Sequence, residues 1–193
     1  MSVVWLHGPL GAGKTTLAHA LRALVHPVAA VALLDEDAVR EAVADATMSW
    51  AVNDAMPLAQ LGGMARVLAG QGLVVIVSAS DVEASLLTWN REHLPGYREV
   101  FLRASPETIK HHARRHKPGA LTPMQRDGAG TPEQTAPSPP PRNPDLTLDM
   151  DNPEPPELLA FRVAVLIPEF VAAAAGAAGA GAAAGVQRLR RGA

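Results

Sequence analysis

A glycine-rich loop constrains the fold of this chain more than any other feature, because of what precedes and follows it. The loop reads GPLGAGKT over residues 8–15 and matches the pattern G-x-x-x-x-G-K-[ST] in full. Residues 2–7 before it form an apolar run that is typical of a buried strand. In residues 14–25 after it, apolar side chains recur at helical spacing. This order predicts a site in which backbone amides surround a phosphate group.

The residue types in the loop suit a nucleoside triphosphate. Gly8, Gly11 and Gly13 permit positive φ angles and a close approach of the backbone to a phosphate. We expect Lys14 to place a point charge on the β- and γ-phosphates of ATP, and the Thr15 hydroxyl to ligate Mg²⁺. A glycine turn that binds nothing is the alternative, and the strand–loop–helix context disfavours it. The predicted residues for binding ATP are Gly8, Leu10, Gly11, Ala12, Gly13, Lys14, Thr15 and Thr16.

Strand and helix patterns alternate over residues 1–167. The expected strands are residues 2–7, 28–34, 73–78, 98–102 and 145–148. The expected helices are residues 14–25, 56–69, 82–93 and 154–167, with others through Val39 and Val43 and from Ser105. Such alternation predicts an α/β fold in which helices cover both faces of a parallel sheet. With the phosphate loop (P-loop), it predicts one P-loop NTPase domain of the nucleotide-kinase type over residues 1–167.

Two segments depart from this alternation. Residues 117–144 are rich in Pro, Gly, Thr and Gln, which predicts a long loop or lid inside the domain. Residues 168–193 are rich in Ala and Gly and indicate a weak helix or a flexible tail, with disorder or fraying expected from Ala172. Arg114 lies where the long loop begins. We predict that it closes over the phosphates of ATP, and a solvated helix end is the alternative.

Charge and composition limit the kinds of partner and the cellular location that we expect. The net charge is −2, and the absence of a basic surplus argues against nucleic acid as a partner. The chain contains no cysteine, and residues 1–7 lack the basic region of a signal peptide. The apolar run at residues 73–78 is too short to span a bilayer. We therefore expect a cytoplasmic protein that binds no membrane, with its assembly open and a homodimer among the options.

An acidic pair follows the second expected strand. Ligands of open parallel sheets bind at the carboxyl ends of the strands, where Asp35 and Asp37 are expected to lie. Either carboxylate would orient or deprotonate an acceptor hydroxyl, or hold the water shell of Mg²⁺. Arg40 lies one turn further and is suited to clamp an anionic acceptor. The alternative is a helix N-cap with solvated charges. The predicted catalytic residues are Lys14, Asp35 and Asp37.

Several segments, in order, resemble the adenylylsulfate (APS) kinase family. Residues 8–18, GPLGAGKTTLA, are similar to the family's G-L-S-G-[AS]-G-K-[ST]-T-[LI]-A. Residues 34–40, LDEDAVR, resemble L-D-G-D-x-[VI]-R, and residues 143–149, NPDLTLD, resemble N-P-D-L-x-[LI]-D. The resemblance implies an ATP- and Mg²⁺-dependent kinase that phosphorylates the ribose 3′-hydroxyl of APS in sulfate assimilation.

The resemblance also implies residue roles. It gives Asp35 or Asp37 the role of base or metal organiser, with Thr15 and Asp35 as the metal residues. It places Asp37, Arg40 and Asn53 at the acceptor, and Ser78 beside the phosphates.

The sequence departs from the family pattern on the acceptor side. Glu36 replaces the glycine between the two aspartates, and residues 50–56, WAVNDAM, keep only the asparagine of R-x-x-N-x-x-R. Each lost charge-assisted hydrogen bond is worth about 1.5–3 kcal/mol. Two alternatives therefore stay open. One is a kinase of the same build for another alcohol, such as a sugar, an antibiotic or a metabolite. The other is a nucleotide-binding protein with little transferase activity.

Overall fold

The structure is a computed structural model that describes residues 1–46, 58–80, 82–116 and 140–176. The strands of these residues are β1 (Val3–Gly8), β2 (Val31–Asp35), β3 (Val74–Ser80), β4 (Arg98–Arg103) and β5 (Leu146–Asp149). The helices are α1 (Lys14–Val25), α2 (Glu36–Ala46), α3 (Leu58–Gly70), α4 (Ala84–His93), α5 (Pro106–His116) and α6 (Pro156–Ala164). The predicted loop at residues 117–144 lies outside the described residues over 117–139.

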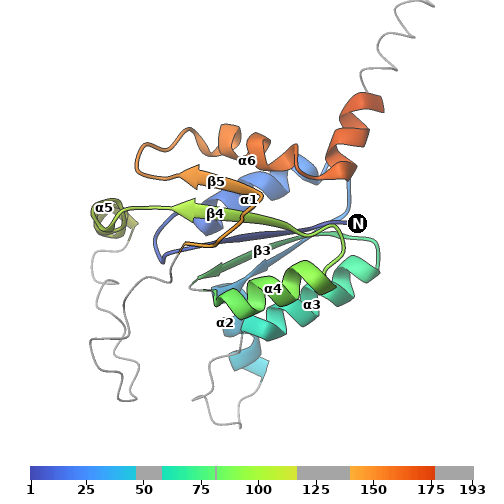
Figure 1. Cartoon of the computed structure of the whole chain (residues 1–193), viewed down its shortest axis with the longest axis horizontal. Coiled ribbons are helices and arrows are strands. Elements are labelled where there is room, and N and C mark those ends of the chain that lie inside the picture. The colour runs from blue at the N-terminus through green and yellow to red at the C-terminus, as the bar shows by residue number, and fades with distance from the viewer. Residues whose placement is uncertain (47–57, 81, 117–139, 177–193) are drawn as a thin grey trace, which may run out of the picture.

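The strands form one parallel sheet in the order β2-β3-β1-β4-β5. Figure 1 shows α1 and α6 on one face of this sheet and α2, α3 and α4 on the other. Strand β1 lies in the middle and is buried throughout, because its alternate side chains enter two different cores. Leu6 packs in the core beneath α1 and α6, whereas Trp5 packs in the core beneath α3 and α4. The α/β, P-loop kinase fold predicted from the sequence is confirmed.

The loop between β1 and α1 begins and ends on glycines that no other residue can replace without strain. Gly8 has a φ of 148°, and a Cβ atom there would lie 2.3 Å from the carbonyl oxygen of Leu102 in β4. Gly13 precedes α1 with a φ of 90° and a ψ of 15°, which is the left-handed conformation. The loop can therefore sit close against β4 and turn directly into the helix.

Strand β2 begins at Val31 rather than at the predicted Val28. The N–H groups of Val28 and Ala29 both donate to the carbonyl oxygen of Val25, at 3.0 and 3.1 Å, and so close the C-terminus of α1. Val28 is exposed. The apolar pattern of residues 28–30 predicts a strand, but these residues make the turn that leads into the sheet.

The sequence left a weak helix or a flexible tail open after α6, with fraying expected from Ala172, and the structure has a helix there. A second helix, Pro168–Gly176, follows at a bend of 93° and extends past Ala172. The buried side chain of Ile167 and the carboxylate of Glu169 anchor its start, because Glu169 accepts from the N-terminal ammonium group and from Ser2 Oγ, both at 2.8 Å. Burial opposes ionisation of Glu169, but these two donors hold its pKa below the usual value. Residues 177–193 lie outside the described residues.

No single helix among the described residues has the length and hydropathy needed to cross a membrane. Helix α6 and the helix Pro168–Gly176 pass that test only when the two are joined across their bend.

Candidate phosphate and acceptor site

The P-loop emerges from the carboxyl end of β1 and leads directly into α1. Lys14 Nζ donates to the carbonyl oxygens of Gly8 and Pro9, at 3.0 and 2.9 Å, and only 6% of the Lys14 residue is exposed. The ammonium group is therefore held over the loop by two backbone carbonyls. The amides of the first turn of α1 have no partner within the helix, as in every α-helix, and they face the same loop. The arrangement presents a cation and helix-end amides to an anion.

Thr15 and Asp35 meet at this loop. Thr15 Oγ1 donates to Asp35 Oδ2 at 2.8 Å, although the two residues belong to α1 and to the end of β2. Asp35 Oδ1 accepts from the backbone amides of Asp37 and Ala38, at 3.2 and 3.4 Å, and so caps α2. One carboxylate thus caps a helix and contacts the P-loop hydroxyl. A hydroxyl and a carboxylate oxygen are ligands that suit Mg²⁺, directly or through its waters.

Arg40 of α2 is held by two carboxylates. Its NH1 group donates to Asp37 Oδ1 at 2.8 Å, and its NH2 group pairs with Glu36 Oε1. The other oxygen of Glu36 accepts from the backbone amide of Ser80, at the end of β3, at 2.8 Å. Sequence reasoning noted Glu36 only as a departure from the family pattern. Its spacing of four residues from Arg40 was the signal for the ion pair.

Three further predicted site residues, Ser78, Arg114 and Asn53, lie in different parts of the chain. Ser78 is buried in β3, where its Cα pairs with Leu6 of β1 and Asp35 of β2. Arg114 lies within the range of α5, and its side chain is outside the described part of the structure. Asn53 lies outside the described residues altogether. The structure therefore brings together Lys14, Thr15, Asp35, Asp37 and Arg40 at the ends of β1 and β2.

Helix α5 and the residue that follows β5 border the P-loop. A Cβ atom on Gly11 would lie 3.4 Å from Ile109 Cγ2, and one on Gly13 would lie 3.5 Å from Met150 Cε. Figure 1 shows α5 beyond the carboxyl ends of the strands, on the side of the loop. Apolar side chains from two other elements therefore pack against the glycines of the loop.

Asp151 forms hydrogen bonds with the residues at the start of α5. Its Oδ1 atom accepts from the Ser105 backbone amide and from Thr108 Oγ1, each at 2.7 Å, and the first of these bonds is the main cause of the lowered pKa of Asp151. Ser105 Oγ in turn accepts from the Thr108 amide at 3.3 Å, which is the hydrogen bond of a helix N-cap. The sequence analysis missed Asp151, because its partners lie more than 40 residues away.

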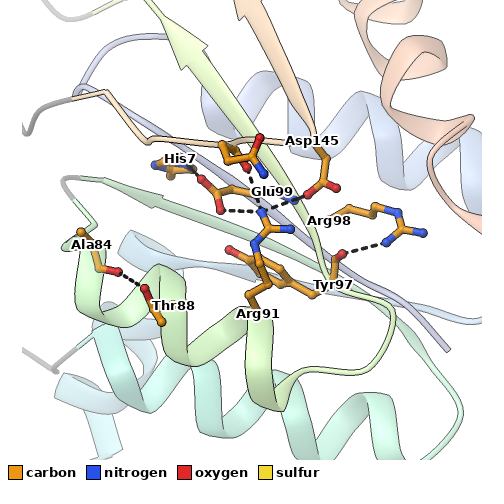
Figure 2. A network of polar contacts seen from close by, with 9 residues as sticks. His7, Ala84, Thr88, Arg91, Tyr97, Arg98, Glu99 and Asp145 are labelled. Carbon is orange, nitrogen blue, oxygen red and sulfur yellow. Dashed lines mark hydrogen bonds and ion pairs between the residues drawn. The ribbon is translucent and has the colours of Figure 1, made fainter.

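A partly buried network of polar contacts lies on β4, beside the strand that leads into the P-loop (Figure 2). The Glu99 side chain, on β4, is 4% exposed and accepts from Arg91 NH2 of α4 at 3.0 Å. Arg91 NH2 also contacts Asp145 Oδ2 at 3.3 Å, and His7 Nε2 lies 3.4 Å from Glu99 Oε1. Desolvation opposes ionisation of Arg91, but both carboxylates favour it, and the net effect raises its pKa. Burial, together with the nearby Glu99 charge, raises the pKa of Tyr97, whose ring lies 5.4 Å from the Arg91 guanidinium carbon.

This network connects three parts of the fold. His7 is the residue immediately before Gly8, Asp145 precedes β5, and Arg91 comes from the helix layer. Asp145 Oδ2 also accepts from the Glu99 backbone amide at 2.8 Å. The strand that carries the P-loop is therefore tied to α4 and to the start of β5. Among the residues that the structure describes, no group of three or more His, Asp or Glu side chains is arranged to hold a metal ion.

Comparison with known proteins identifies the family. The profile of the adenylylsulphate kinase family matches residues 1–149. The chain belongs to the adenylylsulphate kinase family. The resemblance predicted from the sequence is thereby confirmed.

Relatives and solved structures agree with this membership. The adenylyl-sulfate kinase of Deinococcus deserti is 37% identical over 103 residues, which are 53% of this chain and 57% of that protein. The one from Chloroflexus aurantiacus is 40% identical over 78 residues, or 40% of this chain and 42% of that protein. The chain thus spans about half the length of the curated relatives it matches. The Mycobacterium tuberculosis APS kinase, solved with AMPPNP and APS, has a TM-score of 0.65 at 26% identity over 86% of this chain and 96% of that one.

Proposed function

We propose that this protein is an ATP-dependent kinase that transfers the γ-phosphoryl group to the 3′-hydroxyl of APS. The observation that carries the proposal is the hydrogen bond between Thr15 and Asp35, because it joins the P-loop to the carboxyl end of the next strand. Membership of the adenylylsulphate kinase family supports APS as the acceptor. The two alternatives left open by the sequence, another alcohol acceptor or a nucleotide-binding protein with little transferase activity, are not favoured by that match.

Different residues of the site have different roles in phosphoryl transfer. The loop amides and Lys14 bind the β- and γ-phosphates, with Lys14 turning from the carbonyls of Gly8 and Pro9 to the anion. Thr15 and Asp35 would hold Mg²⁺, which when bound neutralises charge on the phosphate oxygens. Asp37 accepts the proton of the acceptor hydroxyl as its oxygen bonds to the γ-phosphorus. The bond from that phosphorus to the β–γ bridging oxygen breaks, and ADP leaves.

We assign the metal role to Asp35 and the proton-accepting role to Asp37 because their surroundings differ. Both oxygens of Asp35 are engaged, by Thr15 and by the start of α2. The Asp37 side chain is 76% exposed and pairs with Arg40 through one oxygen. A base needs a lone pair within reach of its substrate, and an exposed carboxylate at the strand ends offers one. The homodimer, the cytoplasmic location and the roles of Asn53, Ser78 and Arg114 stay predictions.

The test of this function is transfer of γ-labelled phosphate from Mg·ATP to APS. We expect label in 3′-phospho-APS, separated from ATP and inorganic phosphate by chromatography, and no such product when APS is omitted. Label that stays in ATP or is released only as inorganic phosphate, from protein shown to bind ATP, would refute APS as the acceptor.

Replacing Asp35 by asparagine should change the response to Mg²⁺. Asparagine keeps the helix cap as well as aspartate does, so α2 should remain intact. The loss of the carboxylate charge should raise the Mg²⁺ concentration for half-maximal activity about tenfold, equivalent to one charge-assisted interaction. Asp37→Asn is the matched variant and should lower kcat without shifting that concentration. Equal Mg²⁺ shifts in both variants would contradict the division of roles.

A further inference from the structure

Residues 35–40 carry more negative than positive charge at the acceptor side. Three consecutive carboxylates, Asp35, Glu36 and Asp37, stand against the single guanidinium of Arg40, which gives a formal charge of −2. Asp35 is committed to Thr15 and to the cap of α2. The charge near a bound acceptor therefore depends mainly on the ion pairs that Glu36 and Asp37 form with Arg40.

Glu36 is the more firmly placed of the two partners of Arg40. Its side chain is 19% exposed, against 76% for Asp37. One Glu36 oxygen pairs with Arg40 NH2 and the other accepts from the Ser80 amide at 2.8 Å, so the carboxylate bridges the ends of β2 and β3. A partly buried ion pair is screened less by water than an exposed one. Arg40 is therefore held chiefly by Glu36.

The positive charge of the guanidinium is already shared between two carboxylates. NH1 and NH2 both donate to carboxylates, and Arg40 Nε is buried without a hydrogen-bond partner among the described residues. An arginine recognises an anion best through two parallel N–H donors on one side of its planar fork. An acceptor anion at Arg40 therefore competes with Glu36 and Asp37 for the guanidinium charge.

We infer that Glu36 is a specificity-determining residue of the acceptor site, which neutralises Arg40 and so reduces the affinity for negatively charged acceptors. The inference rests on the proposed function, because it concerns the same acceptor site. Glu36 does not touch the reacting atoms. It acts through Arg40, and we expect it to change the affinity for the acceptor rather than the rate of the chemical step.

Replacing Glu36 by glutamine tests this directly. The glutamine oxygen can still accept from the Ser80 amide, while the charge that holds Arg40 is lost. We expect the KM for APS to fall about tenfold, the scale of one charge-assisted hydrogen bond, with the KM for ATP and kcat changed less than twofold. Calorimetric titration of the ADP-bound protein with APS should show the same gain in affinity without any turnover. Glu36→Ala should also lower the KM and the dissociation constant for APS, since it removes the contact between residue 36 and Arg40.

Glu41→Gln is the matched control. Glu41 is exposed on the same helix, so its loss changes the net charge equally without releasing Arg40. An unchanged or raised APS dissociation constant in both Glu36 variants, with melting temperatures like that of the wild type, would overturn the inference. An equal gain in Glu41→Gln would also overturn it, because the effect would then be general electrostatics. Absence of labelled product from the wild type refutes the proposed function instead, and the titration still measures the role of Glu36.

Discussion

Replacing Lys14 by alanine should lower kcat for phosphoryl transfer by a factor on the order of 10²–10³, the cost of removing one preorganised donor from a developing negative charge. Lys14 is nearly buried, and its ammonium group is already held over the loop by the carbonyls of Gly8 and Pro9. When phosphate arrives, the end of the Lys14 side chain turns from those two carbonyls to the anion, while the backbone of the loop stays in place. The rate is measured as label transferred from Mg·ATP at saturating acceptor.

Arg162→Ala is the matched control for the Lys14 variant. Arg162 lies on α6, 44% exposed, in an ion pair with Glu154, so its removal deletes a cation on the face of the sheet covered by α1 and α6. We expect its kcat to stay within twofold of the wild type. A Lys14→Ala protein that melts like the wild type and keeps more than a tenth of its activity would contradict the role given to Lys14.

The P-loop could be predicted from the sequence because its information is local. Gly8, Gly13 and Lys14 follow one another within a single turn of the chain. The burial of β1 shows as a continuous apolar run, and that of α1 as apolar residues at helical spacing. The predicted start of β2 was wrong by three residues, because an apolar side-chain pattern does not show which backbone groups are already hydrogen-bonded. Val28 has an apolar side chain suited to a strand, but its backbone amide is used by the end of α1.

The polar contacts that fix the site were not predictable in the same way. Glu99 reads as one residue of an apolar strand, and nothing near it in sequence shows that it is buried against Arg91 and His7. Asp151 joins a segment 46 residues away, so its role follows only from the sheet order that places β5 beside β4. Long-range pairs of this kind depend on the packing of whole elements, whereas local patterns report only neighbours along the chain.

Replacing Arg91 by alanine should destabilise the protein by about 3 kcal/mol. Removal of one partner of a buried ion pair leaves the other charge uncompensated, at a cost of about 3–5 kcal/mol. We expect the lower end of this range of free energies because the Arg91 side chain is 41% exposed, although that of Glu99 is only 4% exposed. The midpoint of thermal unfolding should fall by about 6–12 °C for a chain of this length. Circular dichroism on heating, together with urea titration, measures the change.

A second substitution shows whether the buried charge causes that loss. Glu99→Gln in the Arg91→Ala background removes the uncompensated carboxylate while keeping the shape of the side chain, and should recover at least half of the lost stability. Arg91 also donates to the Asn143 carbonyl at 3.1 Å and contacts Asp145, and the second substitution leaves both of those losses in place. A double variant as unstable as Arg91→Ala would therefore assign the effect to the segment before β5. Recovery would assign it to Glu99, on β4 beside the strand that carries the P-loop.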